Sequence, residues 1–177
     1  MRPPGASHPI SPAALGAVLF AGALQLALVN FWPGFPSPNE WPRAYQAMAV
    51  VGRASLAIDA EVGRYGGSED LAAGRGGLYP NKAPGMLPLL LPAAALAHVA
   101  SGGDDARELR LTLWLGRLLA ASLPFLLTVL LLDAATFSSG PGGGRVVVLT
   151  YALASPALAA SLLLFSHALS ACLLLAG

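Results

Sequence analysis

Apolar residues gather in four long runs along the chain, and short polar stretches separate most of them. The runs cover residues 11–32, 86–101, 111–132 and 146–177. A helix needs ~20 residues to cross the ~30 Å hydrocarbon core of a bilayer, because each residue adds ~1.5 Å. The pattern therefore predicts an all-α integral membrane protein. It would have about four to five transmembrane helices and one large polar loop, 33–85, between the first two.

Single residues interrupt three of these runs. Pro88 and Pro92 remove backbone donors from the short second run, which predicts a kinked crossing. Arg117 is the one charged residue of the third run, and it either reaches the interface or pairs with another helix. The fourth run is too long for one crossing and too short for two full ones, and Pro156 is expected to divide it into two helices or a helix and a half.

Composition excludes several classes of protein. Hydrophobic residues make up 55% of the 177 residues and charged residues 11%. A soluble domain has about 25% charged residues, and a disordered chain needs low hydrophobicity, so neither class fits. The net charge of +1 gives no reason to expect nucleic acid as a partner. The single cysteine, Cys172, excludes an intramolecular disulfide and a cysteine-based zinc site.

The two ends of the chain lead to two further expectations. The first run is too long for a cleaved secretory signal, so an uncleaved anchor is predicted. The chain ends at 173–177 inside an apolar pattern with no polar flank, which suggests the N-terminal part of a longer protein.

Charge counting alone favours a cytoplasmic loop, because 33–85 carries five basic residues and the opposite side only three.

The polar loop opens with a predicted amphipathic helix. Trp41, Tyr45 and Met48 recur at helical spacing, which predicts a helix over 37–52 on the membrane surface. Glu40 has two interpretations. It could close a capping box with Ser37, or it could act as a general base held at the membrane face.

Two further residues stand out by their position. Lys82 is the last charge before the second run, between Pro80 and Pro84. It could extend to lipid headgroups or hold the phosphate of a lipid-linked substrate. His167 lies in the fourth run, where an ionisable group suggests function, although a histidine hydrogen-bonded to a neighbouring helix is the alternative.

Three short motifs carry a family resemblance. They are Asn39-Glu40-x-x-Arg43 after the first run, Tyr79-x-Asn81-Lys82-Ala83-Pro84-Gly85 before the second, and 164–169 with its Ser-His pair. Together they resemble the membrane glycosyltransferases of the GT-C superfamily, in particular family 39 with its protein O-mannosyltransferases and aminoarabinose transferases. The resemblance covers the N-terminal part of the family's usual length. The chain departs from the family's Asp-Glu pair by having Asn39.

The resemblance implies a site and a reaction. The donor would be a sugar on polyprenyl phosphate, and Glu40 would orient or deprotonate the acceptor hydroxyl as the catalytic residue. Lys82 and Arg43 would stabilise the leaving phosphate, and Asn39, Tyr79 and His167 would complete the substrate site. The loop would face the outside of a bacterial cytoplasmic (inner) membrane, which overrides the charge count.

The resemblance also sets the expected partners. They are the lipid-linked donor, the bilayer and the remaining C-terminal part of the same protein. The sequence shows no cofactor motif and no cluster of metal ligands. A non-enzymatic polytopic membrane protein, such as a transporter segment or an assembly factor, is the alternative. A transporter should show internal repeats, which the sequence does not.

Overall fold

The chain is mostly helical in a computed structural model that describes residues 10–29, 37–136 and 140–177. Within these residues, two helical segments are long and apolar enough to cross a membrane: Pro84–Ser101 and Asp105–Thr136. The predicted predominance of helices is confirmed. The end of the first predicted run, residues 30–32, and the start of the polar loop, 33–36, lie outside the described residues.

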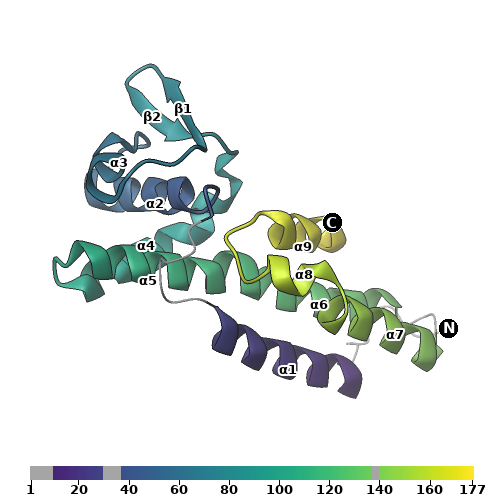
Figure 1. Cartoon of the computed structure of the whole chain (residues 1–177). Helices are drawn as coiled ribbons and strands as arrows, with labels where there is room; N and C mark the ends of the chain where they lie inside the picture. Colours follow the sequence, from purple (N-terminus) through teal and green to yellow (C-terminus); the bar gives the residue numbers. More distant parts are fainter. Residues whose placement is uncertain (1–9, 30–36, 137–139) are drawn as a thin grey trace.

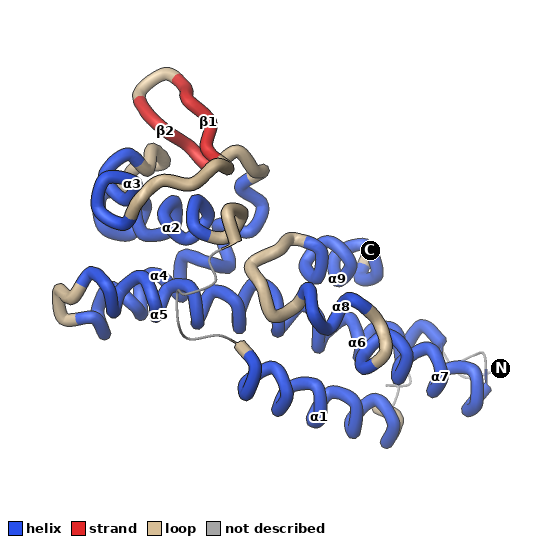
Figure 2. The backbone as a smooth tube through the Cα atoms, in the orientation of Figure 1, coloured by secondary structure: helices blue, strands red, loops and turns tan. Residues whose placement is uncertain are grey.

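The helical elements follow the apolar runs, with additions in the loop (Figures 1 and 2). The helices are α1 (Pro12–Leu28), α2 (Trp41–Arg53), α3 (Asp59–Tyr65), α4 (Leu87–Ser101), α5 (Asp105–Arg117), α6 (Leu123–Thr136), α7 (Gly140–Leu153), α8 (Pro156–Ala160) and α9 (His167–Ala176). The other elements are the strands β1 (Leu71–Gly74) and β2 (Gly77–Pro80), the 3-10 turn η1 (Pro84–Met86) and the π-helical turn η2 (Leu118–Ser122).

One long helix joins the two halves of the molecule. Asp104 begins it by accepting a hydrogen bond from the Arg107 amide (3.0 Å), and α5, η2 and α6 continue without a break. The π-helical turn directly precedes Pro124, whose ring removes a backbone donor. At ~1.5 Å per residue, the 32 residues of the whole helix from Asp105 to Thr136 span roughly 48 Å, more than one bilayer core.

Two hydrophobic cores lie along this helix. The first forms where α2 packs on α4 and α5, with α3 and the β-hairpin covering the other side of α2 (Figure 1). The second forms where α1, α7 and α9 pack around α6. Leu164, from the connection between α8 and α9, belongs to the first core.

The helix α1 turns its small residues inward and its large ones outward. Ala14, Ala17 and Ala21 are buried against α6 and α7, while Leu19 and Phe20 are 65% and 60% exposed. A helix of a water-soluble protein shows the reverse distribution. Small residues let helix backbones approach closely, which is typical of helix packing in lipid.

The predicted break of the last apolar run is confirmed. The helix α7 ends at Leu153, and Ser155 caps α8 by accepting a hydrogen bond from the Ala157 amide (3.2 Å). Pro156 takes the first helical position, where its missing donor costs nothing. A second gap, 161–166, separates α8 from α9.

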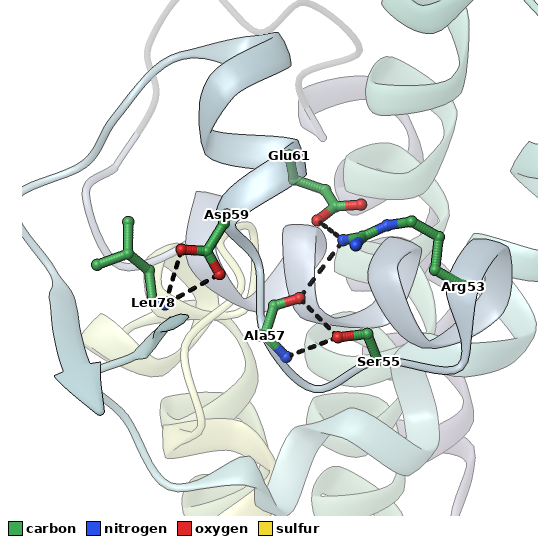
Figure 3. Close-up of polar contacts among 6 residues, drawn as sticks. All are labelled: Arg53, Ser55, Ala57, Asp59, Glu61 and Leu78. Atoms are coloured by element: carbon green, nitrogen blue, oxygen red, sulfur yellow. Dashed lines mark hydrogen bonds and ion pairs between the residues drawn. The ribbon is translucent and has the colours of Figure 1, made fainter. Parts of the chain in front are cut away.

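The all-α prediction missed a two-stranded antiparallel hairpin inside the polar loop. The strands β1 and β2 pair from Leu71 with Pro80 to Gly74 with Gly77. Figure 3 shows Asp59 of α3 directed at the hairpin, where its carboxylate accepts hydrogen bonds from the Leu78 amide (3.0 and 3.1 Å). The hairpin escaped prediction because its strands have four residues each, too few for a clear alternation.

Gly77→Ala is expected to destabilise the hairpin by about 1–3 kcal/mol. Gly77 has φ +144°, and a Cβ atom there would overlap the Asp59 carboxylate. Thermal unfolding in detergent and proteolysis of the hairpin measure the effect. Gly67→Ala is the control, because nothing lies within 4 Å of its Cβ position. Equal stability of the two variants would contradict the contact between Asp59 and β2.

The predicted surface helix exists, but it differs from the prediction in start and in burial. It begins at Trp41 instead of Ser37, because residues 37–40 form a turn closed by the Glu40 amide and the Ser37 carbonyl (2.9 Å). Tyr45 and its neighbours are buried, because α4 covers one face of α2 while α3 and the β-hairpin cover the other. This helix therefore forms part of a core instead of lying free on a surface.

Two contacts do not fit the predicted order of crossings. Ser11, at the start of α1, donates its hydroxyl to Asp133 near the end of α6 (2.6 Å). Arg64 of the polar loop pairs with Asp105 at the start of α5 (3.2 Å). If each of the first three apolar runs crossed a membrane once, both contacts would join residues on opposite sides. The helices are present, and the order in which they would cross a membrane stays a prediction that these two contacts do not support.

Candidate functional site

A pocket of about 400 Å³ lies where α2, the segment before α4 and the start of α9 meet. Its walls are formed by Asn39, Arg43, Lys82, Phe165, Ser166 and His167. Four of these six residues were predicted from the sequence as site residues. They come from three stretches of the chain up to 128 positions apart, between Asn39 and His167. The structure thus brings most of the predicted site together.

Glu40 lies behind this pocket as a buried, fully engaged carboxylate. Its side chain is 0% exposed, and Arg117 donates to both oxygens, from Nε (2.9 Å) and from Nη2 (3.1 Å). The Leu164 amide donates a third hydrogen bond to Oε1 (2.8 Å). A carboxylate held by three donors is not free to accept a proton from a substrate. Catalysis by Glu40 remains a prediction, and it would require Arg117 to release the carboxylate.

The structure answers the question of the capping box. The Glu40 side chain makes no hydrogen bond to the N-terminus of α2, so the capping interpretation is wrong. Ser37 instead accepts a hydrogen bond from the Asn39 amide (3.3 Å). Arg117 explains the difference, because a buried guanidinium needs an anionic partner more than an exposed helix end needs a cap.

Arg43 continues the same arrangement one helical turn later. Its guanidinium donates to the Leu164 carbonyl, so Glu40 and Arg43 bind the N–H and the C=O of one residue. Residues three apart share a helix face, which explains why both reach Leu164. This double contact, together with Arg117, is called the Leu164 clamp below, and it holds the α8–α9 connection against α2.

The charge of Arg43 depends on its surroundings. Burial of the guanidinium lowers the pKa of Arg43 below its usual value, and the carboxylates of Asp70 and Glu40 oppose this change. Within the described residues, its buried Nε has no hydrogen-bond partner. A buried donor without an acceptor is costly, so the described residues do not fully satisfy this guanidinium.

Lys82 faces the pocket from the segment before α4. Its Nζ pairs with Asp70 Oδ1 (3.1 Å), and 41% of the lysine side chain remains exposed. Asp70 is nearly buried, and its Oδ2 has no hydrogen-bond partner among the described residues. The charges of Arg117 and Glu40 cancel each other. Arg43 and Lys82 carry two positive charges and Asp70 carries one negative charge, so one positive charge remains in excess beside the pocket.

His167 and Asn39, which are far apart in the sequence, complete the pocket. His167 is exposed at the start of α9, where its ring meets Phe165 edge to face with centroids 6.0 Å apart. The sequence placed it inside a membrane-spanning helix, but the gap at 161–166 brings it to a helix start instead. Asn39 is half-buried in the turn before α2.

Tyr79 is the predicted site residue that the structure keeps apart from this pocket. It lies in β2, and its hydroxyl donates to the Arg75 carbonyl at the tip of the hairpin (3.0 Å). Its ring also packs against Gly74, because a Cβ atom added at that glycine would lie only 3.1–3.2 Å from the ring. The position of Tyr79 indicates that it supports the hairpin turn.

Sequence reasoning missed Asp70, Phe165 and the pairing of Arg117 with Glu40. A lone arginine in an apolar run was a usable signal, but it did not name the partner. Among residues 10–29, 37–136 and 140–177, no group of three or more His, Cys, Asp or Glu side chains is placed to hold a metal ion. The described donors of the pocket are therefore cationic and neutral groups, which suit an anion.

No protein-family model, no curated protein and no solved structure matches the chain.

Proposed function

We propose that this chain is a membrane protein whose pocket binds the phosphate of a polyprenyl-phosphate-linked sugar, as part of a glycosyltransferase. The observation that carries the proposal is the meeting of Asn39, Arg43, Lys82 and His167 in one pocket. These residues belong to motifs that are distant in sequence. Their excess positive charge suits a phosphate group.

The outward apolar face of α1 supports insertion into a bilayer. Leu19 and Phe20 point away from the core, and Leu174 of α9 is 84% exposed. Such surfaces are unfavourable in water and favourable in lipid. The proposal places the protein in a bacterial cytoplasmic membrane, with the pocket on the outer side.

Within this proposal, the reaction is a displacement at the sugar's anomeric carbon. The acceptor oxygen forms a bond to that carbon while the bond to the phosphate oxygen breaks, and the electron pair leaves with the lipid phosphate. Lys82 and Arg43 stabilise the charge that develops there. His167 offers an imidazole at the pocket that can take the acceptor's proton. Glu40 acts as a positioning residue through the Leu164 clamp.

Chemical modification of Lys82 tests the donor site directly, because it is the only lysine of the chain. An acylating reagent is added to the detergent-purified protein, and modification of Lys82 is followed by mass spectrometry. A polyprenyl phosphate at about ten times its Kd should slow acylation roughly tenfold. The polyprenol without phosphate should have no effect, because the pocket recognises the anion.

Two controls sharpen this experiment. Arg43→Ala should weaken protection of Lys82, whereas Arg75→Ala, which removes the same charge from the exposed hairpin tip, should not. Equal acylation with and without the lipid phosphate would overturn the donor site. The non-enzymatic membrane protein would then be the better interpretation. Transfer of sugar by membranes that contain the complete protein tests the reaction itself.

A further inference from the structure

The contact between Ser11 and Asp133 fixes the relative direction of two helices. Ser11 donates both its backbone N–H (2.9 Å) and its hydroxyl (2.6 Å) to the Asp133 carboxylate, which is almost buried. The start of α1 and the end of α6 therefore lie at the same level of the molecule. An even number of complete membrane crossings must separate these two residues.

The other ends of the same helices meet at a second level. Gln25, in the last turn of α1, donates to the Ser161 hydroxyl (2.6 Å). Ser122, directly before α6, donates to the Ser161 carbonyl (3.1 Å). The helix α1 has 17 residues and spans ~25 Å, close to the ~30 Å of a bilayer core. At ~1.5 Å per residue, these two levels lie roughly 21 Å apart along α1 and roughly 17 Å apart along α6. The helices α1 and α6 thus run in opposite directions between two levels that fit within the thickness of one bilayer core.

The hairpin made of α4 and α5 lies beyond the second level, together with the polar loop. Arg64 of α3 pairs with Asp105 at the start of α5 (3.2 Å). A pocket of about 210 Å³ joins the same two regions, with Arg53, Glu61 and Arg64 from the loop and His98 and Glu108 from the hairpin. In Figure 1, the turn between α4 and α5 extends away from α1 and α7.

We infer that α4 and α5 form a helical hairpin that starts and ends on the side of the membrane where the polar loop lies. The membrane is crossed by α1, then by α6 in the opposite direction, and then by α7. The helix α4 is long and apolar enough to cross, but its contacts keep both of its ends with the loop. This inference rests on the insertion of α1 and α6 in a bilayer, which is part of the proposed function.

The charged pocket between the polar loop and the α4–α5 hairpin contains side chains from both regions. In the predicted order of crossings, His98 and Glu108 would face the opposite compartment from the loop. In the inferred arrangement, the hydrogen bond between these two side chains (3.0 Å) and the ion pair of Arg53 with Glu61 line one pocket. This pocket opens to the same compartment as the candidate site at Lys82.

Site-directed labelling tests the arrangement in the complete protein. Cys172→Ala removes the only cysteine of these 177 residues, and any cysteine outside them is replaced in the same way. Single cysteines are then placed at three exposed positions: Arg75 in the β-hairpin, Ala106 at the start of α5 and Arg145 near the start of α7. A membrane-impermeant maleimide is added to sealed membranes and, separately, to membranes opened with detergent. Cysteines at positions 75 and 106 should react from the same side, and the cysteine at 145 only from the other.

Two results would overturn the inference, and they can be told apart. If position 106 reacts together with 145 and not with 75, α4 crosses the membrane and the hairpin is wrong, while membrane insertion stands. If all three positions react equally in sealed membranes and alkaline carbonate extracts the protein, insertion itself fails, and with it the proposed function.

Discussion

Arg117→Met should lower the free energy of unfolding by about 3–5 kcal/mol, because it leaves the Glu40 carboxylate buried without its counter-charge. Both side chains are almost inaccessible, at 2% for Arg117 and 0% for Glu40. For a chain of this size, the loss corresponds to a fall in Tm of roughly 6–20 °C. Thermal unfolding of the detergent-purified protein measures it.

Two matched variants show whether the buried charge causes this loss. Arg107→Met removes the same charge from an exposed position of the same helix, and it should change stability by at most about 0.5 kcal/mol. Glu40→Gln combined with Arg117→Met removes both charges of this buried pair, so most of the lost stability should return. A normal Tm for Arg117→Met alone would mean that Glu40 is not buried beside it, and the packing of α2 on α5 would be wrong.

Glu40→Gln should reduce sugar transfer by about 10²-fold in the complete protein, because the Leu164 clamp loses its charged partner and the pocket shifts. The amide keeps the size of the carboxylate but removes the negative charge that pairs with Arg117. His167 and Ser166 follow directly after the clamped segment, so they move with it. Initial rates at saturating donor, in membranes with equal amounts of folded protein, measure the effect.

The double variant separates a positioning role from a catalytic one. If Glu40 positions the α8–α9 connection, combining Glu40→Gln with Arg117→Met should restore much of the rate, since the unbalanced charge is gone. If Glu40 is the general base, the loss of 10²–10⁴-fold should persist in the double variant, because no group replaces its proton acceptance. A single Glu40→Gln variant with an ordinary rate would contradict both roles.

The predicted site was recovered in part because several of its signals are local. Glu40 and Arg43 are three residues apart at the start of a helix, so their common direction follows from helical geometry. Lys82 lies in a segment that Pro80 and Pro84 stiffen, just before an apolar helix. Tyr79 shares the motif of Lys82 but points to the hairpin turn, which the motif alone does not reveal.

The sequence by itself determined the helical class, the apolar outer surface and the break at Pro156. These features depend on hydrophobicity and on proline chemistry, which act within a few residues. The tertiary structure alone decided that Glu40 pairs with Arg117, 77 positions away, and that Ser11 meets Asp133, 122 positions away. Apolar periodicity shows which residues avoid water, but it does not specify the direction in which helices pack. The buried charges decide that, because each must find its partner where water is excluded.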